Sequence, residues 1–241
     1  MNTIISLRNV TRDYKIDEKT VITPVHQVSL DVDGGEFIII IGRSGSGKTT
    51  LLNLAAGLIR PTSGEVFISD IDLWSLGDKR LSLLRNRKIG FVFQFPSLLP
   101  SLSSLQNVAL PAFLGSKNGR RDAYARAAQS LETMGLSERL RSFPRQLSSG
   151  EQKRVVIARA LINQPEILLA DEPTSDLDQQ TESEIMSLLL EINKTGVTIV
   201  MVTHGLELIP LATRTLKMEN GLLREYCRNT DGAPTQSLFP V

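Results

Sequence analysis

The chain has 241 residues, which fits one large domain or one domain with an inserted subdomain. Its 27 basic and 26 acidic residues nearly cancel, so no overall charge indicates binding to nucleic acid or to anionic lipid. The apolar runs are far shorter than the roughly 20 residues of a membrane span, and the stretch MNTIISLRNVTRDYK lacks an apolar signal core. Cys227 is the single cysteine and allows no intrachain disulfide. From these observations we expect a cytosolic chain.

Strands are predicted in the first part of the chain at 4–10, 25–32, 37–41, 65–69 and 89–93. The first two have the pattern of edge-forming antiparallel strands, and Asp33-Gly34-Gly35 predicts a turn after the second. Phe37–Ile41 is apolar throughout, as expected for a strand buried on both faces. A glycine-rich loop follows, and segment 48–58 predicts a helix that ends before Pro61.

Helical periodicity dominates from about residue 95 to 160, most clearly at 122–135 and 151–161. The prolines of this region are predicted to lie in loops; they are Pro96, Pro100, Pro111 and Pro144. We interpret the region as an α-helical subdomain inserted into an α/β core. The core resumes with elements predicted at 167–170 (strand), about 178–194 (helix) and 198–203 (strand).

The end of the chain contains one turn signal and one polar segment. Asn220-Gly221 predicts a hairpin turn. The last residues are polar and include proline and glycine, which predicts a frayed end. We therefore expect a single domain over residues 1–228 and a flexible tail at 229–241.

Residues 42–49, GRSGSGKT, match the phosphate-loop pattern G-x-x-x-x-G-K-[ST] between a predicted buried strand and a predicted helix. The glycines allow the backbone to curl so that successive N–H groups point at phosphate oxygens. Lys48 supplies positive charge to the outer phosphates, and Thr49 offers its hydroxyl to Mg²⁺. A chance glycine-rich turn is the alternative, and the strand–loop–helix context argues against it. The predicted phosphate-binding residues are Gly42, Arg43, Ser44, Gly45, Ser46, Gly47, Lys48, Thr49 and Thr50.

An acidic pair, Asp171-Glu172, ends the apolar strand predicted at 167–170. Ligands of open α/β sheets bind at the carboxyl ends of strands. We therefore expect Asp171 to lie near Thr49 and to hold Mg²⁺, and Glu172 to orient and activate the attacking water. An exposed acidic turn before Pro173 is the alternative.

The stretch LSSGEQKR, residues 147–154, leads into the helix predicted at 151–161. It matches the capping-box pattern twice, at Ser148-x-x-Glu151 and at Ser149-x-x-Gln152. A well-capped helix N-terminus is one interpretation. An anion site is the other, because exposed backbone N–H groups and a serine hydroxyl at a helix N-terminus bind phosphate. The stretch by itself leaves both open.

The order of these motifs resembles that of ATP-binding-cassette ATPases, over nearly the whole chain from about 4 to 224. LSSGE, one helix upstream of ILLADE, resembles the family's signature motif, which is formed here by Leu147, Ser148, Ser149, Gly150 and Glu151. The resemblance implies that Gln94 links Mg²⁺ to the helical subdomain. It also implies that Ser175 and Asp178 lie in a loop at a dimer interface. His204 would be a switch residue near the γ-phosphate, and Tyr14 would stack on adenine.

Each of these residues has a purely structural alternative. His204 could be an ordinary residue at the end of a strand, and Gln94 an exposed polar residue beside two phenylalanines. Tyr14 could be a half-buried anchor before a charged loop. Asp178 could cap the following helix, either instead of or in addition to its interface role.

The resemblance implies an α/β fold with a P-loop NTPase (RecA-like) core, an antiparallel β subdomain and an inserted α-helical subdomain. It implies hydrolysis of ATP with Mg²⁺ as cofactor. The implied catalytic residues are Glu172, His204, Lys48 and Gln94, and the implied Mg²⁺ ligands are Thr49, Gln94 and Asp171. Two active sites would form across a homodimer, because closing the dimer places the signature helix of one copy on the γ-phosphate bound by the other.

Two residues depart from the family's usual signature. Ser149 stands where glycine is usual, and a serine there is tolerated if its φ is negative but strained if φ is positive. Glu151 stands where glutamine is common, and its charge opposes a triphosphate while strengthening the helix cap. We expect hydrolysis to be retained at a reduced rate. A Ser149→Gly protein with unchanged turnover would show that this position does not limit the rate.

The implied partners are a second copy of the chain and integral-membrane permease subunits, at the cytoplasmic face of the inner membrane, with no nucleic acid. Three stretches are similar in sequence to the lipoprotein-release and macrolide-export branch: LSSGEQKRVVIARAL, FVFQFPSLLPSLSSLQNVALP and DEPTSDLD. This similarity favours export or mechanotransmission over import. A permease would dock near 94–111, where Phe95, Leu98 and Leu99 are candidates for exposed apolar residues; ordinary packing is the alternative.

Two other functions remain as alternatives from the sequence. A cell-division-type ATPase would regulate a periplasmic partner without transporting a solute. A degenerate cassette would bind ATP without cleaving it, and the presence of Glu172 and His204 argues against that function.

Overall fold

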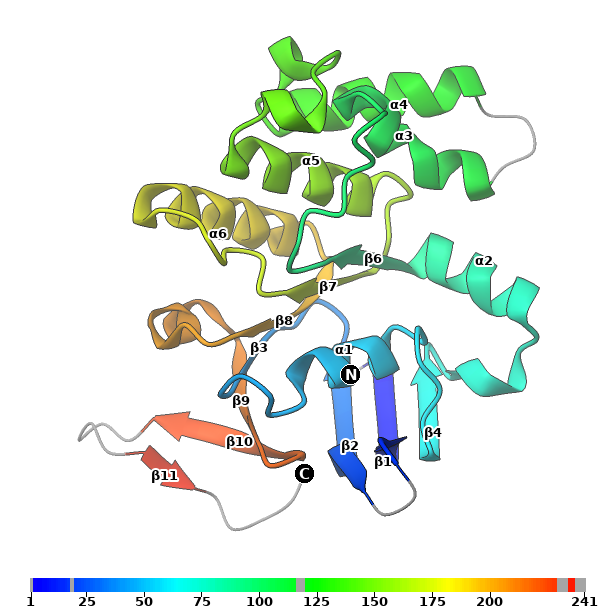
Figure 1. Ribbon diagram of the computed structural model, residues 1–241, viewed down its shortest axis with the longest axis vertical. Helices are drawn as coiled ribbons and strands as arrows, with labels where there is room; N and C mark the ends of the chain where they lie inside the picture. Colours follow the sequence, from blue (N-terminus) through cyan, green and yellow to red (C-terminus); the bar gives the residue numbers. More distant parts are fainter. Residues whose placement is uncertain (1, 18–19, 116–119, 229–233, 237–241) are drawn as a thin grey trace. The chain divides into compact units, whose positions relative to one another are not determined.

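The computed structural model describes residues 2–17, 20–115, 120–228 and 234–236 (Figure 1). The chain divides into two compact units, one of residues 1–81 with 198–241 and one of residues 82–197. Each unit contains both strands and helices, in agreement with the predicted α/β class. Over the described part of the chain, no helix combines the length and the apolar character needed to cross a bilayer.

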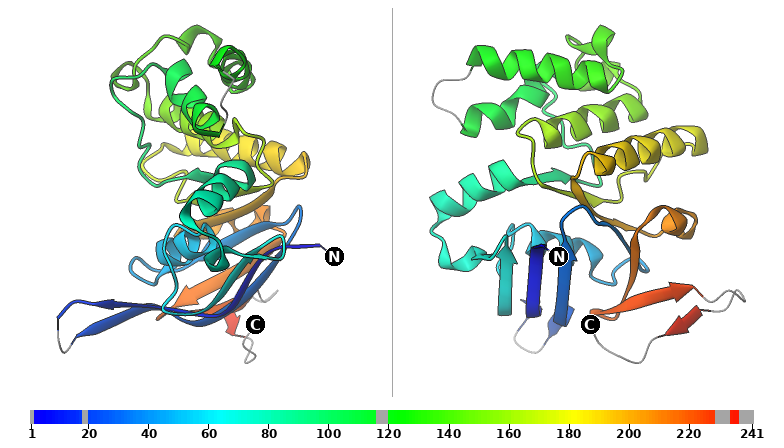
Figure 2. Two further views of the ribbon diagram at one scale, coloured as in Figure 1. Left: turned by 90° about the vertical axis from the view of Figure 1, so that its right-hand side faces the viewer. Right: turned by 180° about the vertical axis from the view of Figure 1, so that it is seen from behind.

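The first unit contains a four-stranded antiparallel sheet in the order β2-β1-β4-β5. Its strands are β1 (Thr3–Lys15), β2 (Val21–Asp33), β4 (Ser63–Ile68) and β5 (Ile71–Asp72). β1 and β2 form the antiparallel pair that the sequence predicts, seen as a long ribbon in Figure 2. Only β2 lies at an edge, however, because β4 pairs with the other side of β1.

A second set of strands in this unit surrounds a fully buried one. The strands are β3 (Phe37–Ile41), β8 (Thr198–Thr203), β9 (Arg214–Glu219), β10 (Leu222–Arg228) and β11 (Pro234–Gln236). β3 pairs in parallel with β8 on one side and with β9 on the other. All residues of β3 and β8 are buried, as expected when strands are covered on both faces. Asn220 and Gly221, with φ of 50° and 79°, form the predicted hairpin turn.

One α-helix, α1 (Lys48–Ala55), packs against strands of this unit, and 3₁₀ turns lie at Leu73–Ser75 and Leu206–Leu211. α1 ends before the predicted limit of residue 58. Gly57 adopts a left-handed φ of 61° just after the C-cap residue Ala56, and this conformation terminates the helix.

The second unit combines a parallel strand pair with a group of helices. β6 (Ile89–Val92) pairs with β7 (Ile167–Asp171). Its helices are α3 (Ser104–Gly115), α4 (Arg120–Thr133), α5 (Ser149–Leu161) and α6 (Gln179–Lys194), with 3₁₀ turns at Ser137–Arg139 and Pro144–Gln146. α3, α4 and α5 pack on one another, and α6 packs on α5 (Figure 1). The helices predicted in these regions are confirmed with ends shifted by a few residues.

Two helices were not predicted. α2 (Asp78–Lys88) is dominated by charged side chains, so its sequence carries little periodic signal. α3 contains Pro111, which the sequence places in a loop. That placement is wrong: the buried residues Val108 and Ala112 pack α3 into the helical group, while Asn86 Nδ2 donates to the Pro111 carbonyl at 3.0 Å. Apart from 234–236, the predicted tail lies outside the described residues.

Candidate functional site

The phosphate-loop motif lies where the sequence predicts, between a buried strand and a helix. β3 ends at Ile41, and α1 begins at Lys48. The intervening loop turns back on itself, with the Ser46 N–H donating to the Arg43 carbonyl at 3.2 Å. The loop therefore presents the first turn of α1 at the carboxyl end of the central strand, where helix N–H groups bind anions.

Gly47 shows why this loop requires glycine. Its φ is +104°, a conformation that L side chains rarely adopt. A Cβ at this position would also lie only 1.9 Å from the Pro24 carbonyl oxygen of β2. The loop is thus packed against the antiparallel sheet of its own unit, which fixes the start of α1.

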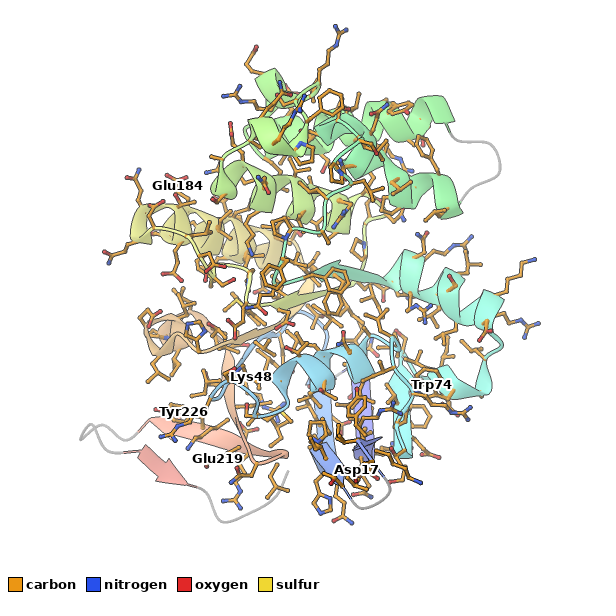
Figure 3. All side chains as sticks on the ribbon, viewed as in Figure 1. Asp17, Lys48, Trp74, Glu184, Glu219 and Tyr226 are labelled. Carbon is orange, nitrogen blue, oxygen red and sulfur yellow. The ribbon has the colours of Figure 1, made fainter. Side chains whose placement is uncertain are left out.

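Two side chains of the loop carry donors that suit a phosphate. Lys48, labelled in Figure 3, is 6% exposed, and its Nζ donates to the carbonyls of Gly42 at 2.8 Å and Arg43 at 3.2 Å. Phosphate oxygens are charged acceptors and form stronger bonds with an ammonium group than carbonyls do. The Ser46 hydroxyl is buried and has no hydrogen-bond partner within the described chain. Thr49 is exposed and Thr50 half-buried on the first turn of α1.

His204 lies beside this loop in the first unit. β3 and β8 are parallel neighbours, and Ile41 pairs with Thr203. Gly42 and His204 are therefore the next residues on adjacent strands, and both leave the sheet at its carboxyl edge. His204 is exposed, and the following Gly205 N–H donates to the Thr203 hydroxyl at 3.0 Å. This placement is compatible with the switch-histidine role, which stays a prediction.

Tyr14 lies near the end of β1, directly opposite Ile22 of β2. Its side chain is 36% exposed, and the Arg12 guanidinium lies 4.6 Å from the ring centroid. The ring is thus stacked on a cation on one side. Stacking on adenine and simple anchoring are both compatible with this position.

The acidic pair lies at the end of β7 in the second unit. Asp171 is the last residue of this buried strand and is 4% exposed. Glu172 follows with a φ of +44°, which is uncommon for a residue with a side chain and unfavourable before Pro173. Ser175 holds this turn, since its N–H and its hydroxyl both donate to the Glu172 carbonyl, at 3.1 and 2.9 Å. Backbone strain of this kind is concentrated at functional sites.

The signature stretch forms one capping box and not two. The Glu151 N–H donates to Ser148 Oγ at 3.2 Å, and the Ser148 N–H donates to Glu151 Oε2 at 2.8 Å. Ser149 is the first helical residue, and the Gln152 amide instead donates to the carbonyls of Pro144 and Leu147. The second predicted box is therefore wrong, because Gln152 points back to the preceding 3₁₀ turn.

The two departures from the usual signature are accommodated by this geometry. Ser149 is helical, and it is not among the residues of the described chain with positive φ, so its side chain causes no backbone strain. The Ser148 N–H and the nearby Arg139, which contacts Glu151 at 2.8 Å, lower the pKa of the Glu151 carboxyl group. Glu151 is therefore engaged within its own chain as the cap partner.

Gly150 and Asp178 bring the N-terminus of α5 next to that of α6. A Cβ on Gly150 would lie 2.6 Å from Thr181 Cγ2, so this position has no room for a side chain. Asp178 caps α6, with its carboxylate accepting from the Thr181 N–H at 3.0 Å and from the Thr181 hydroxyl at 2.6 Å. The hydroxyl and backbone N–H of Thr181 lower the Asp178 pKa. The predicted N-cap role of Asp178 is confirmed.

Lys153 is a site residue that the sequence prediction missed. It is 3% exposed, and its Nζ donates to the Gln94 carbonyl at 2.7 Å. Burial lowers the Lys153 pKa, while the charges of Asp176, Asp171 and Glu172 oppose this effect. The sequence contained one signal of this burial: Lys153 lies just before the apolar run Val155–Ala158 of the same helix. The structure shows that this run is buried.

A groove in the second unit lies near the candidate docking residues. It has a volume of about 390 Å³ and is lined by Phe91, Phe93, Leu99, Leu114 and Arg159, among others. Phe95 is 71% exposed and Leu99 43% exposed, as predicted. Leu98 is half-buried, which fits the alternative of ordinary packing better than an exposed docking residue.

Comparisons with known proteins identify the family of the chain. The sequence profile of the ABC transporter family matches residues 25–175. The chain is 45% identical over 216 residues to the lipoprotein-releasing system ATP-binding protein LolD of Aquifex aeolicus, covering 90% of this chain and 92% of that protein. It is 42% identical over 228 residues to the macrolide export ATP-binding/permease protein MacB of Rhodopirellula baltica, covering 93% of this chain and 33% of that protein.

The fold is likewise that of solved cassettes. The structure is similar to the dimeric post-hydrolysis state of the ATP-binding cassette MJ0796 bound to ADP and Pi, with a TM-score of 0.85 and 40% identity over 92% of this chain and 98% of that one. A second dimeric structure of MJ0796, titled a bacterial ABC transporter cassette, gives a TM-score of 0.84 at 41% identity, covering 90% of this chain and 95% of that one. The chain belongs to the ABC transporter family as an ATP-binding and ATP-hydrolysing subunit.

Proposed function

We propose that this subunit powers a separate membrane permease by Mg²⁺-dependent ATP hydrolysis in an ATP-closed homodimer. The geometry at residues 42–49 carries the proposal, because a buried strand, a glycine loop and a buried lysine there supply what an anion site at a helix N-terminus needs. The dimeric cassettes of similar fold support assembly with a second copy. The proposed cassette covers residues 1–228, with α3, α4 and α5 as the core of a helical subdomain at about 95–160.

The residues for phosphate binding and catalysis are those predicted from the sequence. Lys48 and the N–H groups of the loop bind the outer phosphates. Glu172 accepts a proton from the attacking water, and His204, which leaves the sheet beside Gly42, contacts the γ-phosphate. The positive φ of Glu172, held by Ser175, supports its assignment as the base.

The donors available for Mg²⁺ are the Thr49 hydroxyl, the Asp171 carboxylate and the Gln94 amide oxygen. All are hard oxygen ligands of the kind Mg²⁺ prefers, and they fit that ion better than a transition metal. When bound, Mg²⁺ neutralises phosphate charge during transfer. Asp171 ends its strand in a fixed, buried position, whereas Thr49 is exposed on α1.

The signature helix serves the site of the partner copy. The Ser148 hydroxyl accepts from the Glu151 N–H and retains its own hydrogen for donation to a phosphate oxygen. The first N–H groups of α5, including that of Gly150, have no intrahelical acceptor. Capping and anion binding are thus compatible, and both roles are assigned to the same residues.

The permease partner belongs to the lipoprotein-release and macrolide-export type, as the names of the LolD and MacB relatives suggest. Its cytoplasmic segment docks on the groove beside Phe95 and Leu99, whose exposed apolar surface supports this assignment. The subunit then lies at the cytoplasmic face of the inner membrane. These relatives favour the release and export branch over a cell-division role.

Substituting the proposed base tests the function. Glu172→Gln should lower the ATPase rate by roughly 10²- to 10⁴-fold, because proton removal from the water is lost. Size-exclusion chromatography should then show an ATP-dependent dimer. Glu191→Gln, at an exposed position of α6, is the matched control and should behave as the wild type. Normal turnover of the Glu172→Gln protein would show that another group acts as the base.

A further inference from the structure

The signature helix α5 holds the segment that follows β6 through two basic side chains. Lys153 Nζ donates to the Gln94 carbonyl at 2.7 Å. Arg159, on the same helix, donates to the carbonyls of Pro96 at 3.3 Å and Ser97 at 2.9 Å, and to the Ser97 hydroxyl at 3.0 Å. Residues 94–97 are therefore fixed to α5 by their main chain at both ends.

Lys153 is the more unusual of the two, because lysine is rarely buried unless its charge is paired. Removing an ammonium group from water is costly, and a methionine of similar length would fill the same space without that cost. The charge is offset within the second unit by one carbonyl acceptor and by interactions with Asp171, Glu172 and Asp176. Packing alone does not account for a lysine here.

The bond from Lys153 leaves the side chain of Gln94 available. It uses the main-chain carbonyl, so the Gln94 amide remains for the Mg²⁺ role in the proposed function. The same ammonium group interacts electrostatically with the acidic end of β7, which carries the two carboxylates assigned to the site. The Lys153 ammonium group thus bonds to Gln94 and attracts the carboxylates of Asp171 and Glu172.

We propose that Lys153 is a positioning residue for the ATPase reaction, which fixes Gln94 relative to the acidic end of β7 and joins both to the signature helix. The inference rests on the proposed function for the roles of Gln94 and Asp171. Its consequence is mechanical: a displacement of α5, when its N-terminus engages a phosphate, is transmitted to residues 94–97 through Lys153 and Arg159.

The test compares Lys153→Met, which removes both charge and hydrogen bond, with Lys153→Gln, which retains a donor without charge. Arg154→Met is the matched control, since the neighbouring Arg154 contacts Glu184 (labelled in Figure 3) and the Met134 carbonyl instead of Gln94. Amide hydrogen exchange is measured over 94–99 in nucleotide-free protein. The Mg²⁺ concentration for half-maximal ATPase and the affinity for ATP in EDTA are measured alongside.

Lys153→Met should exchange the amides of 94–99 roughly tenfold faster than the wild type. It should also need about tenfold more Mg²⁺, as expected when the support of a metal ligand is lost, with unchanged affinity for ATP in EDTA. Lys153→Gln should restore slow exchange, and Arg154→Met should match the wild type in every measurement. A simple packing role would lower stability and activity without changing the Mg²⁺ requirement.

The inference is overturned if Lys153→Met retains both the exchange rate and the Mg²⁺ requirement of the wild type. If Lys153→Met does not fold, Lys153→Gln carries the test, because loss of charge alone should still raise the Mg²⁺ requirement. Failure of the proposed function is distinguishable: a wild-type protein without Mg²⁺-ATPase activity would refute that proposal, and the exchange measurement would still report whether Lys153 holds Gln94.

Discussion

At the scale of single residues, the conformation of the backbone decides what several side chains can do. Glu172 adopts a positive φ before a proline, and Ser175 holds that turn. Ser149 adopts a helical conformation, so its side chain is tolerated where the family usually has glycine. Neither conformation follows from residue type, because each is imposed by the neighbours that bond to the turn or to the helix.

Tyr14 gives a prediction about nucleotide affinity. Tyr14→Ala should raise the dissociation constant for ATP about tenfold, because stacking of a base on an aromatic ring contributes roughly 1–3 kcal/mol. Tyr14→Phe should bind as the wild type. Titration with a fluorescent ATP analogue measures both, with Tyr124→Ala as control, since Tyr124 on α4 has a similar exposure of 37%. Equal affinities of the Tyr14→Ala and Tyr14→Phe proteins would support the anchor interpretation instead.

At the scale of elements, the N-terminus of α5 is defined by contacts on two sides. Its capping box connects Ser148 to Glu151, and its first turn packs on Thr181 of α6. The helix start is therefore formed by contacts within the chain itself. The contact with Thr181 and the capping box can be removed one at a time by substitution.

Gly150→Ala should lower the free energy of unfolding by about 1–3 kcal/mol, because its Cβ overlaps Thr181 Cγ2. Thr181→Ser removes that methyl group and keeps the hydroxyl that bonds Asp178. In the Thr181→Ser background, Gly150→Ala should be nearly neutral, as a double-mutant cycle with urea denaturation would show. Equal losses in both backgrounds would mean that the overlap is not the cause.

Glu151→Gln should reveal a pH-dependent contribution of the capping box. The Ser148 N–H lowers the Glu151 pKa below its usual 4.5 in the folded protein, so its contribution is complete above that pH and is lost as pH falls through the lower folded value. The variant should be less stable by roughly 0.5 kcal/mol at pH 7. Urea denaturation between pH 7 and 3 should show this difference shrinking in acid, and a constant difference would contradict the assignment. Glu132→Gln is the control.

At the scale of the whole molecule, the proposed active sites require two copies. In the proposed function, the phosphate loop of one copy works with the signature helix of the other, and the similar cassettes of known structure are dimers. A subunit alone would bind ATP in a half-built site. The proposed function therefore makes association of two copies part of the catalytic cycle.

The specific ATPase activity should therefore rise with protein concentration, because the fraction of dimer rises by mass action. The measurement is turnover per subunit over a concentration range that spans the monomer–dimer transition seen by light scattering. The Glu172→Gln protein with ATP gives the dimer reference. A constant turnover in samples that are monomeric throughout would contradict a site shared between copies.

The sequence determined the elements whose signal is local. The uninterrupted apolar runs at 37–41 and 198–203 form the buried strands β3 and β8, and GRSGSGKT lies between strand and helix as its pattern predicts. One capping box, the Asp178 N-cap and the Asn220-Gly221 turn follow from short-range hydrogen bonding. Such features depend on a few consecutive residues, and their physical causes are therefore visible in the chain.

Tertiary structure alone decided the features that depend on distant neighbours. Pro111 is helical because α3 is packed among other helices, and β1 is interior because β4 pairs with it. Thr181 occupies the space that a side chain at position 150 would need, so only glycine fits there. Lys153 is buried against the Gln94 carbonyl. In each case a contact between residues far apart in the chain outweighs the local preference, and no pattern of adjacent residues encodes it.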